Sequence, residues 1–171
     1  MKKINKILSA LVASLAIGFV AASFVACSDD DDDDVSTVAV YKDSEATADS
    51  YETITFFSDN TVKGHSYEKY TEEGFSVITD FDMFVGTYTG NPTADGTVKI
   101  TVTKMVNEDA VSEEDMEKKC EAAVAAGKTS LTFTNSDFPL EAVSDVSIEA
   151  VVSGKTATID FDGDSDTYTR Q

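Results

Sequence analysis

Alternating apolar and polar residues run through the chain from Val35 onward and predict β-strands. Period two places successive side chains on opposite faces of a strand, so one face is expected to be buried and the other to meet solvent. The clearest apolar sets are Val98, Ile100 and Val102; Val146, Ile148, Ala150 and Val152; and Ala157, Ile159 and Phe161. The many Thr, Val, Tyr and Phe residues agree with this, because strands favour β-branched and aromatic side chains.

Turn-forming residues separate these runs at short, regular intervals. Ser58 to Asn60 interrupts one pair of runs, Asn91 to Gly96 the next, and Ser153-Gly154 the last long pair. Such spacing is typical of hairpins between antiparallel strands. We therefore predict a mainly β fold, an antiparallel up-and-down meander that closes as a β-barrel or, alternatively, stacks as a β-sandwich.

One segment, near residues 112–126, breaks the alternation and predicts a helix. Ser112 and Asp115 have the spacing of a capping box, and Val111 and Met116 have that of a hydrophobic staple. Gly127 is suited to end the helix, because C-terminal caps favour a residue that adopts positive φ. The residues expected on its buried face are Met116, Cys120, Ala123 and Val124.

Residues 1–26 have the layout of a secretory signal peptide, which is removed and takes no part in the fold. Lys2, Lys3 and Lys6 precede an uncharged and mostly apolar run from Ile7 to Val25. An uncleaved membrane anchor is the alternative, since the run approaches the roughly 20 residues that span a bilayer. Its many Ala, Ser and Gly residues, and the lack of a basic residue directly after it, favour the cleaved signal.

Phe24 to Cys27 resembles the lipobox of bacterial lipoproteins, with Phe24 where that family usually has Leu. In that family the cysteine sulfur receives a diacylglycerol, and cleavage then frees an amine that takes a third acyl chain. The resemblance implies lipidation of Cys27. Each buried CH₂ contributes about 0.8 kcal/mol, so several acyl chains anchor a protein stably.

Six aspartates, Asp29 to Asp34, follow Ser28. Like charges repel one another and stay solvated, so residues 27–36 are predicted to be an acidic disordered tether ahead of a β domain at 37–171. Cys27 followed by Ser and Asp also resembles the surface-export signal of Bacteroidota lipoproteins. That resemblance implies an outer membrane lipoprotein exposed on the cell surface; a periplasm-facing lipoprotein is the alternative.

The net charge of −19 excludes some partners. Removal of residues 1–26 makes it more negative, because that segment holds three lysines and no acid. Such a charge repels nucleic acid and anionic headgroups, so no nucleic-acid partner is expected and membrane contact falls to the lipid anchor. Lipidation of Cys27 leaves Cys120 without a partner for an intramolecular disulfide. The oligomeric state stays open.

Three short stretches resemble the strands of bacterial lipocalin-like lipoproteins. They are Thr53 to Asn60, Gly86 to Gly90 and Gly96 to Val102, and Thr167 to Thr169 repeats the pattern of Thr87 to Thr89. The resemblance covers Tyr51 to Thr103 well and the rest loosely. It implies an up-and-down barrel of about eight strands, wide enough for side chains or one small apolar ligand.

An acidic stretch near the C-terminus is the strongest candidate for a metal site. Asp160, Asp162, Asp164 and Asp166 surround Gly163 and offer the hard oxygens that calcium prefers. Aligning Gly163 with the glycine of an EF-hand loop puts Thr169 at the position of the bidentate Glu, so that motif does not fit. We predict an acidic hairpin loop without a metal, with a weak calcium site of another kind as the alternative.

Few residues suggest catalysis. His65 is the only histidine, so a zinc site would need Asp, Glu or Cys as its other protein ligands. A nucleophile pair of Cys120 and His65 stays open, although no catalytic-cysteine signature surrounds either residue. A buried thiol is usually inert, and Asp80 and Asp82 are predicted to face solvent. We predict a protein that is not an enzyme and carries no cofactor.

The predicted function is that of a non-catalytic envelope lipoprotein whose lipocalin-like barrel binds a small apolar molecule. The alternative is an adhesion or interaction module that binds protein or glycan through its loops. An open interior lined by Tyr and Phe favours the first hypothesis. A filled interior with an exposed aromatic patch favours the second. The sequence names no ligand-binding residues.

Overall fold

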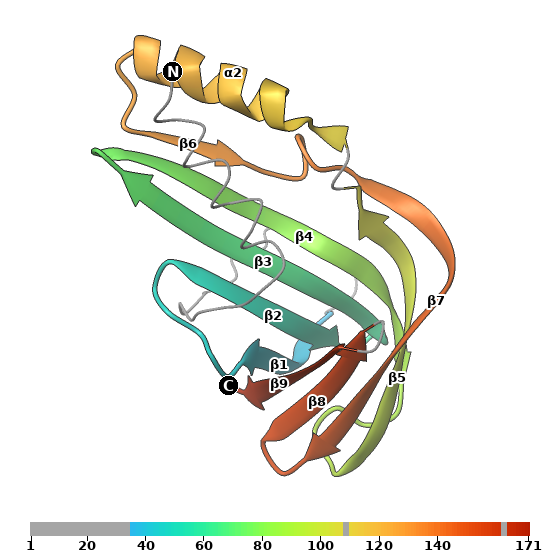
Figure 1. Cartoon of the computed structure of the whole chain (residues 1–171). Coiled ribbons are helices and arrows are strands. Elements are labelled where there is room, and N and C mark those ends of the chain that lie inside the picture. The colour runs from blue at the N-terminus through green and yellow to red at the C-terminus, as the bar shows by residue number, and fades with distance from the viewer. Residues whose placement is uncertain (1–34, 108–109, 162–163) are drawn as a thin grey trace.

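The computed structural model describes residues 35–107, 110–161 and 164–171, which form a closed barrel with one added strand and one helix (Figure 1). The strands are β1 (Thr37–Asp43), β2 (Ser50–Phe57), β3 (Thr61–Glu72), β4 (Phe75–Thr89), β5 (Gly96–Val106), β6 (Ser130–Phe133), β7 (Leu140–Ser153), β8 (Thr156–Phe161) and β9 (Asp164–Arg170); the helix is α2 (Glu113–Ala125).

Eight of these strands form the barrel. From β1 to β5 each strand pairs antiparallel with the next, β5 pairs with β7, β7 to β9 continue the meander, and β9 pairs with β1 to close the circle. The predicted up-and-down barrel is therefore confirmed, and the sandwich alternative is wrong. A closed barrel leaves no unpaired sheet edge along its circumference, which is the physical advantage of this arrangement.

The barrel core is built from the inward residues of all eight strands. Its buried members are Ala39, Tyr41, Ile54, Phe56, Val62, Phe84, Tyr88, Val98, Ile100, Val102, Ile148, Ala150, Val152, Ala157, Ile159 and Tyr168. The alternation at residues 98–102 and 148–152 is thus confirmed. Gly86 also faces inward on β4, and a Cβ there would lie 2.3 Å from the carbonyl oxygen of Thr101 on β5.

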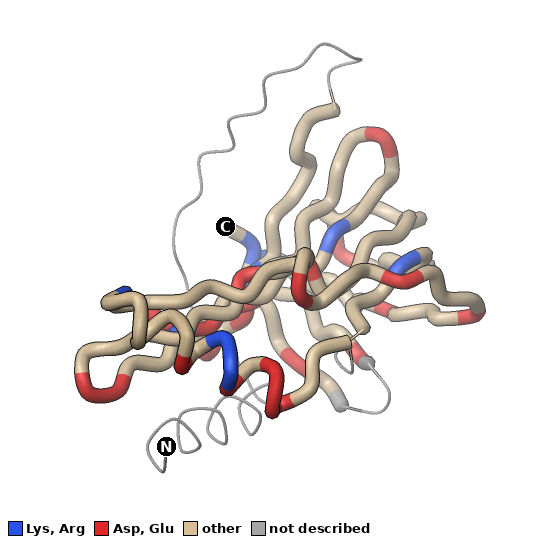
Figure 2. The backbone as a smooth tube through the Cα atoms, turned by 90° about the horizontal axis from the view of Figure 1, so that it is seen from above, with Lys and Arg blue, Asp and Glu red and all other residues tan. Residues whose placement is uncertain are grey.

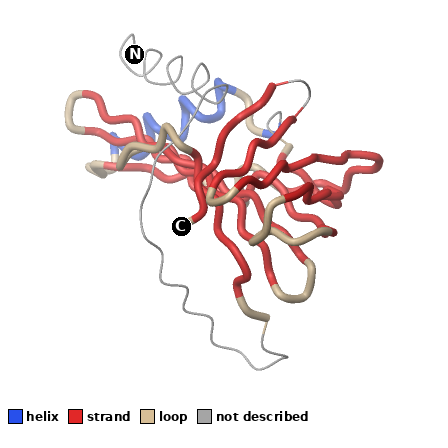
Figure 3. Tube along the Cα trace, turned by 90° about the horizontal axis from the view of Figure 1, so that it is seen from below, coloured by secondary structure: helices blue, strands red, loops and turns tan. Residues whose placement is uncertain are grey.

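The hairpin of β3 and β4 is longer than its neighbours and carries a second core beyond the barrel. It reverses at Glu73-Gly74, where φ is 51° and 86°. β6 runs parallel to the first part of β4, and α2 lies over this region (Figures 1 and 3). We call the buried set there the helix core: Phe75, Val77, Phe81, Met116, Cys120, Ala123, Phe133 and Phe138.

The caps of α2 agree with the sequence. The Ser112 hydroxyl accepts a hydrogen bond from the Asp115 N–H at 3.2 Å and donates to the Asp115 carboxylate at 2.7 Å. At the other end, Gly127 has φ of 72° and the Lys128 N–H donates to the Ala123 carbonyl, the pattern of a Schellman motif. The prediction for Val124 is wrong, because this side chain is 46% exposed.

Acidic residues are spread over strands and turns around the whole fold (Figure 2). The chain has 32 acidic residues against 13 lysines and arginines. Among the described residues, no helix has both the length and the hydropathy that crossing a bilayer requires. The signal peptide, Cys27 and the aspartate run, all predicted within residues 1–34, lie outside the described residues.

Candidate functional site

One end of the barrel interior is filled by side chains. Tyr41, Val98 and Ile100 are each 0% exposed. The loop between β4 and β5 is bound to this end, because the buried Tyr41 hydroxyl donates to the Pro92 carbonyl at 2.6 Å and the Arg170 guanidinium donates to the Thr93 carbonyl at 2.7 Å. These apolar residues thus pack against one another and leave almost no surface for a ligand.

The opposite end of the interior is polar and acidic. β1 runs antiparallel to β4, so it ends, at Asp43, away from that loop. Asp43 pairs with Tyr168 of the barrel core, so both side chains point into the barrel. The same alternation directs Glu52 inward, two residues before Ile54, and Asp166 inward, opposite Ile159.

We call these four residues the acidic end: Asp43, Glu52, Asp166 and Tyr168. They change from exposed to buried along the interior, since Asp166 is exposed, Glu52 is half-buried, and Asp43 and Tyr168 are each 5% exposed. The Tyr168 hydroxyl donates to Glu52 Oε2 at 3.1 Å. Burial raises the pKa of Tyr168, and the charge of Glu52 raises it further, so the hydroxyl keeps its proton and remains a donor.

Asp43 is the least satisfied group of this set. Its Oδ1 accepts a hydrogen bond from the Glu45 N–H at 2.7 Å, whereas its Oδ2 is buried and has no hydrogen-bond partner in the described part of the chain. Burial raises the pKa of this carboxyl to about 6, and the charges of Asp166 and Glu45 add to the rise. A buried charge without a partner is costly, so this position requires an explanation.

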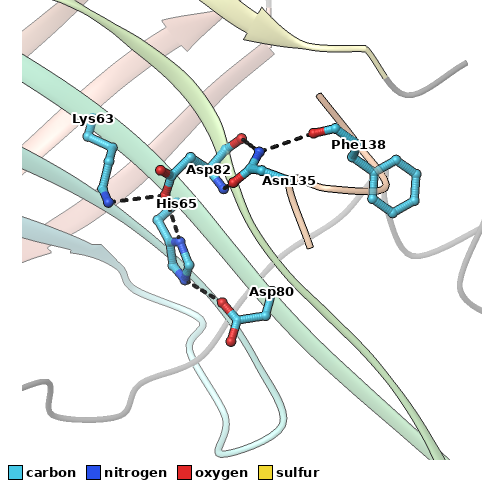
Figure 4. A network of polar contacts seen from close by, with 6 residues as sticks. All are labelled: Lys63, His65, Asp80, Asp82, Asn135 and Phe138. Carbon is cyan, nitrogen blue, oxygen red and sulfur yellow. Dashed lines mark hydrogen bonds and ion pairs between the residues drawn. The ribbon is translucent and has the colours of Figure 1, made fainter. Parts of the chain in front are cut away.

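A second polar group lies on the outer face of the β3–β4 hairpin (Figure 4). His65 Nδ1 is 3.1 Å from Asp82 Oδ1, and His65 Nε2 is 3.3 Å from Asp80 Oδ1. Lys63 Nζ is 3.2 Å from the same oxygen of Asp82. Burial raises the pKa of Asp82, but the hydrogen bond from His65 and the charge of Lys63 outweigh it, so the pKa lies below its usual value.

Asp80 and Asp82 lie on the outer face, as predicted, with side chains 43% and 25% exposed, and each also interacts with His65. Asp82 is also held through its backbone by Asn135, which precedes β7. The Asp82 N–H donates to Asn135 Oδ1 at 2.7 Å, and Asn135 Nδ2 donates to the carbonyls of Asp82 and Phe138 at 3.0 and 3.1 Å. The strand pairing shifts by one residue at this point, so the group stabilises a bulge in β4.

The open alternative of a Cys120–His65 nucleophile pair finds no support. His65 pairs with Asp82, so it lies on the outer face, whereas Phe81 and the helix core with Cys120 lie on the other face of the hairpin. Cys120 is 0% exposed, and burial raises the pKa of its thiol to about 11. A thiol that stays protonated and buried is a poor nucleophile, in agreement with the predicted inert role.

The aspartates proposed as a weak calcium site do not converge within the described residues. Asp166 pairs with Ile159, so it points inward, while Asp160 points outward and accepts a hydrogen bond from the Ser165 hydroxyl. Asp162 and the side chain of Asp164 lie outside the described residues. Over the described ranges, no group of three or more His, Cys, Asp or Glu side chains is placed to hold a metal ion.

The comparisons with known proteins add no family. No protein-family model matches the chain, and neither a curated protein nor a solved structure matches it. The barrel architecture is confirmed by the structure, whereas membership of the lipocalin-like lipoproteins stays a prediction.

Sequence reasoning did not identify Asp43, Glu52 or Tyr168. One signal was present: Tyr41 and Asp43 are two residues apart, so a strand that buries the tyrosine also turns the carboxylate inward. The pairing of β1 with β9, which brings Asp43 beside Tyr168, joins the two ends of the domain and could not be read from local pattern.

Proposed function

We propose that this chain is a non-catalytic cell-envelope lipoprotein whose lipocalin-like barrel binds a small molecule at the acidic end. One observation carries the proposal: the interior of a closed barrel changes from a filled apolar core to an end with inward polar side chains. Ligand sites commonly combine an apolar surround with a few placed polar groups, and barrel mouths are frequent positions for them.

The filled apolar core supports a site at the polar end of the interior instead of the expected apolar one. A small apolar molecule was expected among Tyr and Phe side chains, but those residues pack against each other. The Phe56 and Tyr88 rings lie 4.9 Å apart, edge to face, and the Tyr41 and Phe56 rings lie 6.0 Å apart in the same manner. A ligand at the acidic end instead contacts groups that can form hydrogen bonds.

The alternative function, an interaction module that binds protein or glycan, is favoured by the filled interior. The interaction module would also need an exposed patch of aromatic side chains as its binding surface. The large hydrophobic residues that are exposed in the described ranges are valines: Val35, Val38, Val124 and Val151. The interaction module thus has the filled interior but lacks the exposed aromatic patch within the described residues, so ligand binding is the better-supported proposal.

Native mass spectrometry of protein extracted gently from its own membranes tests ligand binding. We expect a species heavier than the lipidated polypeptide, with an excess mass that is lost on denaturation. A preparation that contains only the lipidated polypeptide under several mild extraction conditions contradicts ligand binding and favours the interaction module.

Replacement of Cys27 tests the anchor. Cys27→Ser removes the sulfur that would carry the diacylglycerol, so we expect the protein to move from the membrane fraction to the soluble fraction. Cys120→Ala is the matched control, because it removes the other thiol and should leave the protein at the membrane. If the Cys27→Ser protein stays in the membrane fraction, lipid anchoring at this residue is wrong.

A further inference from the structure

We propose that the acidic end binds a small primary ammonium compound, with the carboxylates of Asp43 and Glu52 accepting hydrogen bonds from its N–H groups. This inference rests on the proposed small-molecule function and gives the chemical class of the ligand. It also replaces the apolar ligand that the sequence suggested by one that carries a positive charge.

The first argument is the unsatisfied oxygen of Asp43. Asp43 is 5% exposed, and its Oδ2 is buried without a hydrogen-bond partner in the described ranges. Its pairing with Tyr168 directs the side chain into the barrel, toward the same interior as Glu52. A buried carboxylate oxygen is normally paired, and an N–H donor from a ligand would satisfy it.

The second argument is the sign of the charges around this oxygen. The charged groups that act on Asp43 are Asp166 from β9 and Glu45 from the adjoining loop, both acidic. Glu52 from β2 faces the same interior and is joined to the Tyr168 hydroxyl. Carboxylates gathered in a partly desolvated place repel one another, and a bound cation removes that repulsion.

Tyr168 acts as a positioning residue in this arrangement. Its hydroxyl keeps its proton and donates to Glu52 Oε2 at 3.1 Å, which fixes one oxygen of that carboxylate. Tyr168 thus neighbours Asp43 in the pairing of β1 with β9 and is joined to Glu52 through its hydroxyl.

The geometry favours an ammonium group over the other cations. The described residues provide no group of three or more ligating side chains for a metal ion. A quaternary ammonium has no N–H, so it cannot supply the hydrogen bond that Asp43 Oδ2 lacks. A primary ammonium has three N–H donors and can therefore bond to more than one carboxylate.

Binding of butylammonium to the full chain in detergent, followed by saturation-transfer difference NMR, tests this inference. Butanol serves as the neutral match, tetramethylammonium as the quaternary match, and Ca²⁺ as a competing metal ion. At pH 7.5 and 150 mM salt, we expect butylammonium to bind at least 10-fold more tightly than butanol or tetramethylammonium. Millimolar Ca²⁺ should not displace it.

Two variants assign the site. Asp43→Asn should weaken butylammonium binding at least 10-fold, and Glu52→Gln should weaken it by a smaller factor. Asp49→Asn is the matched control, because it removes one negative charge from the loop between β1 and β2 at a side chain that is 62% exposed. This control should change binding less than 2-fold. Thermal unfolding of each variant shows that the fold is retained.

The pH dependence gives an independent readout. Lowering the pH from 7.5 to 5.0 takes Asp43 through its raised pKa of about 6, so the wild-type affinity should fall. The charged groups that act on Asp43 are Asp166 from β9 and Glu45 from its own loop. Tyr168 of β9 is its partner in the strand pairing, and Glu52 of β2 is hydrogen-bonded to that tyrosine. Asp43→Asn should bind weakly at both pH values.

Four results would overturn the inference: equal binding of butanol, equal binding of tetramethylammonium, displacement by Ca²⁺, or unchanged affinity in Asp43→Asn. Its failure is distinguishable from failure of the proposed function. If native mass spectrometry finds a retained neutral or anionic ligand, small-molecule binding stands and the ammonium class is wrong. If no ligand is retained and no probe binds, both are wrong.

Discussion

Asp43 makes the stability of the protein depend on pH, because the alternation of its strand buries its carboxyl group. The alternation of β1 places it inside the barrel, where its carboxyl loses solvent and meets other acids. Burial favours the neutral form, so the folded protein holds this proton more tightly than the unfolded chain does. The contribution of Asp43 to stability is therefore present at low pH and is lost as the pH rises through about 6.

Replacing Asp43 by Asn should remove the loss of stability that accompanies ionisation of this carboxyl group. As the pH rises from about 4 to about 7, the free energy of unfolding of Asp43→Asn should increase relative to wild type. The gain should reach up to about 3 kcal/mol, since a pKa difference of one unit corresponds to about 1.4 kcal/mol. Urea unfolding followed by circular dichroism at several pH values measures it. Asp49→Asn is the exposed control, and curves for Asp43→Asn and wild type that stay parallel would contradict the interpretation.

Gly86 is required by close packing of two backbones. A Cβ at this inward position would lie 2.3 Å from the Thr101 carbonyl oxygen, which is backbone and cannot rotate away. We expect Gly86→Ala to lower the free energy of unfolding by about 1–3 kcal/mol, the usual range for overpacking. Thr87→Ala, the exposed neighbour, should change it by only about 0.5 kcal/mol. If urea unfolding shows equal effects of the two substitutions, the close contact with the Thr101 backbone does not explain the need for glycine at position 86.

At the scale of elements, β4 is the strand that joins the two cores. Its first part pairs with β6 and faces the helix core, while its last part pairs with β5 and faces the barrel core. The change of partner leaves Asp82 between the two pairings, and the Asn135 side chain supplies the missing hydrogen bonds there. Met83 lies at the same point and packs against both cores.

Asn135→Ala should loosen this junction. It removes three hydrogen bonds and leaves half-buried backbone groups unsatisfied, so we expect a loss of about 1–3 kcal/mol in the free energy of unfolding. Amide hydrogen exchange should also accelerate at Asp82, whose N–H donates to Asn135 Oδ1. Ser136→Ala, at the exposed next position, serves as the control. If the amide hydrogen of Asp82 exchanges at the same rate in Asn135→Ala as in wild type, the Asn135 side chain does not stabilise this junction.

For the whole molecule, the excess of acidic residues is the dominant electrostatic property. The chain has a net charge of −19. Within the described residues the acidic side chains lie on strands and turns, so the folded state repels itself (Figure 2). Surface ion pairs such as that of Lys118 with Glu114 act in the opposite direction, but exposed pairs contribute little.

Salt should therefore stabilise the protein. Raising NaCl from about 20 mM to about 500 mM shortens the distance over which charges interact and weakens the self-repulsion. We expect the melting temperature to rise, as followed by circular dichroism at pH 7.5. A lower melting temperature at high salt would mean that ion pairs, including that of Lys63 with Asp82, outweigh the repulsion.

The sequence by itself determined the strands around residues 53–70, 85–103 and 146–161, most of their inward faces, the helix with its caps and the meander. Each of these follows from periodicity or turn chemistry within a few neighbouring residues, as at residues 98–102 and Ser112 to Gly127. It missed the turn at Glu73-Gly74 and the short strand β6, which has too few residues to show a period.

Only the tertiary structure decided how the barrel closes and where its polar groups meet. β1 and β9 are far apart in sequence, so the pairing of Asp43 with Tyr168 depends on register around the whole circle of strands. The same holds for Asn135 against Asp82. A strand pattern states which side a residue faces, but which residues face each other is decided by closure, because closure joins segments that share no local signal.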